Sequence, residues 1–451
     1  MRPMFDMLSA AARRASLHMP GHQGAAPFGA ADLYALATTE LDCTDNLYAA
    51  SGAIAEAEAL YAASAGAGAS LLMTNGSTAG VQTMLMLFAR PGDAVLLPRN
   101  AHVSAINGCV LGGLTPIWIP VRLREDGSVR VDEGDVLDAI RRHPQARLLL
   151  LTRPDYYGVC MPLERVIEAA HAAGMAVAVD EAHGAHFPWM DGLSSAGRCG
   201  ADAWTQSAHK TLPALTGSAV LHLKDAGLLA RAKTVLRRGQ SSSPSFLLLL
   251  SLDDARAWMD LHGVDALRRV VGAANRFRQN LRATPYRDAH ALWAAQGELL
   301  DPTRLVLDAP QGGFALAEAL SAHGLDAEMA DERRVVLILT AMTPEKRLDA
   351  LLALLKTLPA EPKAFASTAL PGLPNAVMEP RRAAMGPTAW VALEQAVGRV
   401  AALPAGLYPP GIPLVCPGEE ISRAVVACLS AAAPEKRFGL EGDALCVTTD
   451  V

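Results

Sequence analysis

The sequence predicts an α/β fold, with a mostly parallel sheet in a large domain and a smaller α+β region toward the C-terminus. Between about residues 70 and 223, short apolar segments alternate with segments of helical periodicity. This alternation is typical of a parallel sheet that is covered by helices on both faces. Beyond about residue 275 the alternation stops. At 451 residues the chain is long for one compact core, so several domains are expected.

The first strand of the large domain is expected at 70–73, followed after a glycine-containing turn by a helix that extends to Ala89. The later strands are expected at 94–97, 115–119, 147–152, 175–180, 202–207 and 217–223. A helix is expected at 162–173, because a proline stands near its start and Gly174 follows its end.

The smaller region is expected to combine two strands, at 305–308 and 335–340, with helices near 314–323 and 344–358. The last part of the chain carries the proline-rich stretch LYPPGIPLVCPGEE and ends with a helix and short strands. The predicted divisions are an N-terminal segment (1–45), a large domain (46–275), a small α+β domain (276–370) and a C-terminal domain (371–451).

Composition argues against several classes of protein. The net charge is −6 and no long run of lysine or arginine occurs, so a nucleic-acid partner is not expected. The seven cysteines include no CxxC pair, which favours reduced thiols in the cytoplasm over a disulfide framework or a zinc site. The N-terminus lacks the apolar core of a signal peptide, and the apolar stretch at 246–252 is too short to cross a bilayer.

Lys210, in the segment SAHKTL (207–212), follows a predicted strand. A lysine that is held at one point, with a lowered pKa, can act as a nucleophile. Ser207 and His209 beside it can bind a phosphate group. A single lysine after a strand is more often a solvated surface residue, so this interpretation depends on the motifs that accompany it.

Asp180 ends the apolar run 175–179 and begins the segment DEAHG. In open α/β sheets, ligands bind beyond the carboxyl ends of the strands. A carboxylate in that place can pair with the protonated pyridine nitrogen of pyridoxal 5'-phosphate and keep the ring an electron sink. Alone, Asp180 would more readily be a capping residue; together with Lys210 it indicates a pyridoxal-phosphate site.

Three further segments fit such a site. Ser77 and Thr78 stand where a helix begins, so their hydroxyls and the helix N-terminus can bind phosphate, although they would equally serve as an ordinary cap. His102 follows a strand and could stack on the cofactor ring or simply cap a helix. Ser242 lies in a hydroxyl-rich segment that is either an ordinary loop or a phosphate ligand across a dimer interface.

In their order along the chain, these motifs resemble the bacterial-type ornithine/lysine/arginine decarboxylases of pyridoxal-phosphate fold type I, the aspartate-aminotransferase-like fold. The resemblance covers nearly the whole chain and is to the short form of the family, without the N-terminal wing domain. The motifs are HMPGHQG (18–24), TNGSTAG (74–80), RNAHVS (99–104), VDEAHGAH (179–186), SAHKTLPAL (207–215), SSSPSF (241–246) and YPPGIPLVCPGE (408–419).

The resemblance implies a role for each matching residue. Lys210 would be the Schiff-base lysine, and Asp180 would hold the pyridine nitrogen. Ala182 would pack beneath the ring and His102 would stack on its other face, while His183 would lie near the phenolic oxygen or the departing carboxylate. The phosphate would be bound by Ser77, Thr78, Ser207 and His209, and by Ser242 from the neighbouring subunit. The active site would therefore lie at the interface of a homodimer, with or without further assembly.

A basic substrate needs a carboxylate for its distal charge. Asp42, Asp45 and Glu419 are the candidates, ahead of Glu328 and Asp331, and each could instead be an ordinary surface carboxylate.

The chain also departs from the family pattern. The family often has lysine at the positions of Gln23 and Val103, and the segment 152–158 carries an unexpected arginine and aspartate, Arg153 and Asp155. These departures bear on the substrate and leave the cofactor residues intact.

The predicted reaction is the pyridoxal-phosphate-dependent decarboxylation of arginine, lysine or ornithine to an amine, a reaction that can supply polyamines. Transamination on the same fold is the first alternative; it commonly uses a dedicated arginine for the substrate carboxylate, and Arg381 and Arg382 stand in no familiar motif. A non-catalytic homologue is the second, and the joint presence of Lys210, Asp180 and the phosphate residues disfavours it.

Overall fold

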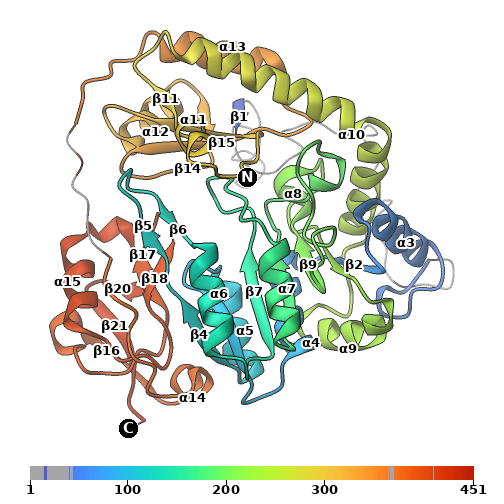
Figure 1. Ribbon diagram of the computed structural model, residues 1–451, viewed down its shortest axis with the longest axis vertical. Coiled ribbons are helices and arrows are strands. Elements are labelled where there is room, and N and C mark those ends of the chain that lie inside the picture. The colour runs from blue at the N-terminus through green and yellow to red at the C-terminus, as the bar shows by residue number, and fades with distance from the viewer. Residues whose placement is uncertain are drawn as a thin grey trace, which may run out of the picture.

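The computed structural model describes residues 15–17, 40, 44–363, 365, 370–409 and 411–450. A seven-stranded sheet, with strand order β2-β10-β9-β8-β7-β3-β4, forms the centre of the large domain (Figure 1). Its strands are β2 (Ala69–Met73), β3 (Ala94–Pro98), β4 (Thr115–Ile119), β7 (Leu148–Thr152), β8 (Ala176–Asp180), β9 (Ala203–Gln206) and β10 (Ala219–Leu223). The mostly parallel sheet is confirmed: only β10 runs antiparallel, to both β2 and β9.

Both faces of this sheet are buried, which explains why its strands read as continuous apolar runs. In β7, Leu148 and Leu150 pack on one face, and Leu149 and Leu151 pack on the other. The first face is covered by α4 (Gly76–Phe88), α5 (Val103–Gly112) and α9 (Leu229–Gly239). The second is covered by α6 (Glu133–Arg142) and α7 (Glu164–Ala172).

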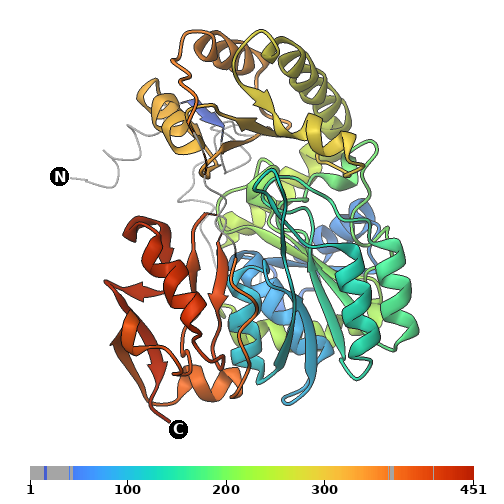
Figure 2. The same ribbon diagram turned by 60° about the vertical axis from the view of Figure 1, so that its left-hand side comes forward.

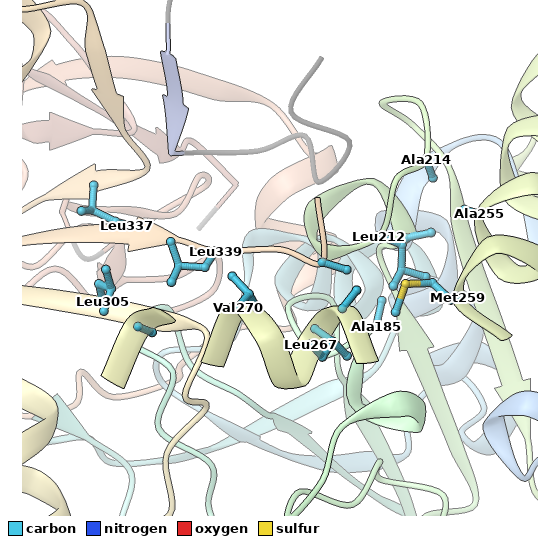
Figure 3. Packing of buried hydrophobic residues seen from close by; sticks show 14 of the residues in the cluster. Ala185, Leu212, Ala214, Ala255, Met259, Leu267, Val270, Leu305, Leu337 and Leu339 are labelled. Carbon is cyan, nitrogen blue, oxygen red and sulfur yellow. The ribbon is translucent and has the colours of Figure 1, made fainter. Parts of the chain in front are cut away.

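The helix α10 (Phe246–Leu281) has 36 residues and connects the large and small domains. It was not predicted, and the expected boundary between residues 275 and 276 lies inside it. Figure 3 shows Leu267 and Val270 of α10 between buried residues of the two domains. Met259 lies near Leu212 on one side, and Leu305 lies on the other. The two domains therefore share one hydrophobic core.

The small domain contains an antiparallel sheet of order β11-β12-β15-β14, as the α+β prediction requires. Its strands are β11 (Arg287–Asp288), β12 (Arg304–Asp308), β14 (Met329–Ala330) and β15 (Arg334–Ile338). Its helices are α11 (Ala289–Ala295), α12 (Gly313–Ala322) and α13 (Glu345–Leu355). A separate pair joins β1 (Ala15–Leu17) to β13 (Leu325–Ala327) in parallel.

The C-terminal domain has its own core and lies beside the large domain, with the small domain above (Figure 2). Its two sheets have the orders β16-β21-β20 and β18-β17-β19. The strands are β16 (Thr388–Ala392), β17 (Ala405–Leu407), β18 (Ile412–Val415), β19 (Arg437–Phe438), β20 (Leu440–Glu441) and β21 (Ala444–Thr448). The helices are α14 (Pro380–Met385) and α15 (Arg423–Ala431).

The remaining regular elements complete the large domain. They are α3 (Ala53–Ala65), α8 (Ala208–Thr211), β5 (Arg122–Leu123) and β6 (Val129–Arg130). Among the helices of the described residues, none has both the length and the apolar character needed to span a membrane.

Candidate active site

A cavity of about 270 Å³ lies at the carboxyl ends of the parallel strands. Ser77 follows β2, His102 follows β3, Asp180 ends β8 and Lys210 follows β9, and all four line the cavity. The C-terminal domain contributes further lining residues, Tyr408, Gly411, Ile412 and Phe438. The cavity therefore lies where open α/β sheets bind their ligands, and the C-terminal domain forms another part of its wall.

Lys210 stands in the short helix α8, and its Nζ lies 3.1 Å from His183 Nε2. Burial lowers the pKa of Lys210 below its ordinary value, against the attraction of the Asp180 carboxylate. A lowered pKa increases the fraction of free amine at neutral pH. Lys210 therefore has the environment that a nucleophilic lysine requires.

Asp180 is buried at the floor of the cavity. Its Oδ1 accepts a hydrogen bond from the Ala182 N–H at 3.1 Å, and within the described residues it has no ion-pair partner. Burial raises the pKa of Asp180, with His102 and Lys210 acting in the opposite direction. A nearby cation favours the anionic form of a buried carboxylate, and the protonated ring nitrogen of pyridoxal 5'-phosphate is such a cation.

The N-terminus of α4 can receive the cofactor phosphate. Its N-cap, Asn75, makes no side-chain capping hydrogen bond. The Gly76 N–H donates to the Gly217 carbonyl at 2.8 Å, so the N–H groups that keep their attraction for an anion are those of the next residues, Ser77 and Thr78. Gly76 has a φ of +68°, which forms the tight turn from β2 and leaves open space beside the helix end. Ser77 lines the cavity, whereas the Thr78 side chain is exposed.

Ser207 and His209 form a second polar pair beside Lys210. Ser207 Oγ lies 3.2 Å from His209 Nδ1, and this nitrogen donates to the Ser218 carbonyl at 3.1 Å. Neither residue is among those that line the cavity, so their phosphate contacts remain a prediction. Taken together, the buried Asp180, the uncapped helix and the buried lysine fit pyridoxal 5'-phosphate.

Of the two functions that the sequence left open for His102, the helix cap is present, and stacking on the cofactor ring stays a prediction. His102 is the N-cap of α5, where its Nδ1 accepts the Ser104 N–H at 3.2 Å, and it also lines the cavity. Since Nδ1 is an acceptor, the ring proton is on Nε2. Burial lowers the pKa of His102, so the ring is a neutral, flat surface that is suited to stacking.

His183 has two neighbours that no sequence motif predicted. Arg304, in the small domain, places its Nη2 2.9 Å from His183 Nδ1, and the ring of Tyr156 lies 4.9 Å from the His183 ring between centroids. Burial, Lys210 and Arg304 together hold the pKa of His183 well below its ordinary value. Arg304 is 121 residues from His183 in sequence, so only the tertiary structure could reveal this contact.

Of the other predicted cofactor residues, Ala182 lines the cavity, and its packing beneath the cofactor ring stays a prediction. Ser242 is exposed and does not line the cavity of its own chain. The segment that precedes it is attached to the end of β2, because Gln240 Oε1 accepts the Thr74 N–H at 3.1 Å.

Of the three favoured substrate-binding candidates, Asp45 and Glu419 lie outside the cavity, and Asp42 falls outside the described residues. Asp45 accepts the N–H groups of Ser51, Gly52 and Ile54, which is a local structural role. Glu419 forms a buried, bidentate ion pair with Arg99.

Among the less favoured candidates, Glu328 lies in an adjacent cavity of about 700 Å³, which Tyr408 also lines. Asp331 accepts the Tyr157 hydroxyl at 2.7 Å.

The residues that depart from the family pattern differ in whether they line the cavity. Val103 and Asp155 both line the cavity, but Asp155 Oδ2 is already 3.2 Å from Arg130 Nη1. Gln23 falls outside the described residues. Arg153 directly follows β7 and is buried, and its Nη1 lies 3.6 Å from Glu181 Oε1. Arg153 therefore balances a buried carboxylate and does not enter the site.

Glu181 should make stability depend on pH. Burial raises its pKa from 4.5 to about 7, although Arg153, Gln206 and the Ala196 N–H stabilise the anion. Because the folded state holds this proton more tightly, the contribution of Glu181 to stability should fall as the pH rises from about 4.5 to 7, by about 3 kcal/mol. In Glu181→Gln this loss is absent, so the variant should gain stability relative to the wild type between pH 5 and 8.

Urea midpoints for both proteins across this pH range measure the effect. Any hydrogen bond that glutamine fails to make costs the same at every pH, so only the change with pH is diagnostic. Glu435→Gln, at an exposed carboxylate, is the control and should follow the wild type. If the plots of urea midpoint against pH run parallel for Glu181→Gln and the wild type, the raised pKa of Glu181 is contradicted.

Known proteins resemble this chain along nearly its whole length. The model of the Orn/Lys/Arg decarboxylase major domain matches residues 2–337, and the model of its C-terminal domain matches residues 362–438. An uncharacterized Bacillus subtilis protein, YaaO, is 33% identical over 95% of this chain and 93% of its own. The arginine decarboxylase of Bacillus subtilis is 29% identical over 93% and 91%.

The fold is also that of a solved decarboxylase. Lysine decarboxylase A from Pseudomonas aeruginosa superposes with a TM-score of 0.75 at 19% identity, over 91% of this chain and 73% of its own. This likeness and those to other pyridoxal-phosphate enzymes confirm the predicted fold type I.

Proposed function

This chain belongs to the Orn/Lys/Arg decarboxylase family, and from that premise we propose that it converts a basic amino acid to its amine and CO2 with pyridoxal 5'-phosphate as cofactor. The observation that carries the proposal is the meeting of three features at one cavity: the Lys210 amine, the buried Asp180 carboxylate and the uncapped N-terminus of α4. The first would hold the cofactor covalently, the second would bind its ring nitrogen and the third its phosphate.

When it is bound, the cofactor supplies the electron sink that accepts the electron pair of the broken bond between Cα and the carboxylate. The residues of the chain supply orientation and protons. Asp180 would stabilise a positive charge on the ring nitrogen, and His102 and Ala182 would hold the ring in a fixed orientation. Lys210 Nζ or His183 Nε2 returns a proton to Cα, since both atoms lie together at the cavity.

The proposed substrates are arginine, lysine and ornithine, because the named relatives are arginine and lysine decarboxylases. Asp45 and Glu419 stay predictions as partners of the distal charge, and their present hydrogen bonds within the chain give them no support. We further propose a homodimer with Ser242 reaching the neighbouring site, a cytoplasmic location and a contribution to polyamine supply. The exposure of Ser242 supports the first of these.

The test is CO2 release from cofactor-loaded protein with each of the three amino acids offered separately. One of them should be preferred over the next by about 10- to 200-fold, the range that one methylene group provides in an apolar pocket. The amine should appear in the same amount as CO2.

Formation of a keto acid in place of CO2 would contradict decarboxylation and favour transamination. Absence of turnover, with no borohydride-reducible cofactor on Lys210, would favour a non-catalytic homologue.

A further inference from the structure

The buried guanidinium of Arg304 forms hydrogen bonds to His183. Arg304 is the first residue of β12 and is fully buried. Its Nη2 lies 2.9 Å from His183 Nδ1 and 3.4 Å from the His183 carbonyl. Its Nε and Nη1 make no hydrogen bond to any described residue. Gly158 leaves space for the aliphatic part, since a Cβ there would lie 2.5 Å from Arg304 Cγ.

This contact determines where the proton of the imidazole lies. A guanidinium has donors only, so Nδ1 of His183 must be the acceptor. A neutral imidazole has one acceptor nitrogen, and the proton is therefore on Nε2. Nε2 lies 3.1 Å from Lys210 Nζ and must donate to it, which requires that Nζ has a free lone pair. An ammonium at Lys210 could not form this hydrogen bond.

Burial and the Arg304 cation favour a neutral imidazole and a free amine, whereas the Asp180 and Glu328 carboxylates favour the ammonium form of Lys210. Five charged or titratable groups face His183: Lys210 and His209 from α8, His102 from the N-cap of α5, Arg304 from β12 and Tyr156 from the turn after β7. Those that act on Lys210 are Asp180, Glu328 and Arg304. Burial lowers the pKa of both His183 and Lys210, and Arg304 lowers both further.

We propose that Arg304 is a positioning residue that holds His183 as the Nε2–H tautomer and thereby presents Lys210 Nζ as a free amine. The inference rests on the proposed role of Lys210. It extends that role, because it makes a residue of the small domain responsible for the protonation state of the lysine. Arg304 does not line the cavity, so it acts through His183.

The first measurement is the tautomer itself. The full-length protein, freed of cofactor and labelled with ¹⁵N in its histidine rings, is compared by NMR with His183→Gln to assign the His183 signals. In the wild type, Nδ1 should be unprotonated and Nε2 protonated. The Arg304→Met variant should lose this preference, whereas Arg304→Lys, which keeps a charged donor, should retain it. A protonated Nδ1 in the wild type would overturn the proposal without the use of any variant.

The second measurement is the reactivity of Lys210 toward acetic anhydride in the same protein, quantified by mass spectrometry. The exposed Lys346 is the internal reference. Without Arg304, Nε2 is free to accept from a Lys210 ammonium, so labelling of Lys210 at pH 7 should fall about tenfold in Arg304→Met and much less in Arg304→Lys. Equal labelling in the wild type and Arg304→Met would overturn the proposal.

Both readouts are independent of the substrate. If no basic amino acid is decarboxylated, the proposed function fails while the tautomer and the labelling results stand. If CO2 is released but His183 carries its proton on Nδ1, the function stands and the role of Arg304 fails. Should Arg304→Met not fold, the wild-type tautomer and the Arg304→Lys variant decide the matter.

Discussion

Replacing Lys210 with alanine should lower the rate of CO2 release at least about 10³-fold, the largest loss expected from any single substitution in this chain. Lys210 is the one lysine among the residues that line the cavity. The substitution removes both the covalent attachment of the cofactor and a proton donor for Cα. Activity is measured as CO2 release with the preferred amino acid under saturating cofactor.

The control for this prediction is Lys346→Ala, at an exposed lysine of the small domain, which should retain full activity. Borohydride reduction should leave a pyridoxyl group on the Lys210 peptide of the wild type and on no peptide of Lys210→Ala. The variant should still take up the cofactor without a covalent bond, because Asp180 and the α4 N-terminus are unchanged. Substantial activity in Lys210→Ala would exclude the proposed mechanism.

Removing one partner of the Arg99–Glu419 pair should have the largest effect on stability. The two side chains are 3% and 2% exposed, and both guanidinium–carboxylate contacts are shorter than 2.8 Å. Arg99 follows β3 and Glu419 follows β18, so the pair joins the C-terminal domain to the large domain. Glu419→Ala leaves a buried cation without its counter-charge, which costs about 3–5 kcal/mol.

The loss of stability in Glu419→Ala should be concentrated in the segment 405–421, which contains the cavity residues Tyr408 and Ile412. Hydrogen exchange of peptides from this segment should accelerate about 10²-fold or more in Glu419→Ala, with a fall in kcat/KM. Because the segment carries part of the cavity wall, stability and activity should decline together.

Two controls separate the buried charge from other effects. The double variant Arg99→Met, Glu419→Leu removes both charges and should lose much less protection than Glu419→Ala. Arg268→Ala breaks an exposed pair with Asp191 and should leave exchange in 405–421 unchanged. If the double variant loses as much protection from hydrogen exchange as Glu419→Ala, the loss is due mainly to packing or to the hydrogen bond from Arg99 to the Pro413 carbonyl.

Local patterns in the sequence were sufficient to predict the strands of the large sheet. Each of its predicted strands is present within two residues of the expected ends, because burial on both faces leaves an uninterrupted apolar run. The long helix α10 escaped prediction, since its first turns are apolar on every side and resemble a buried strand. Its length becomes understandable only from its position against two domains.

The sequence by itself also determined the centre of the site. Asp180 ends a strand, and His102, His183 and Lys210 each follow one. A parallel sheet brings the ends of such strands to one edge, so these residues meet at one cavity.

Only the tertiary structure decided the contacts between distant segments. Glu419 is a candidate substrate ligand in the sequence and the buried partner of Arg99 in the fold. Arg304 belongs to no motif, yet it directs the proton of His183. Contacts of this kind depend on how whole domains pack, and such packing leaves no periodicity or spacing in the chain that could be read beforehand.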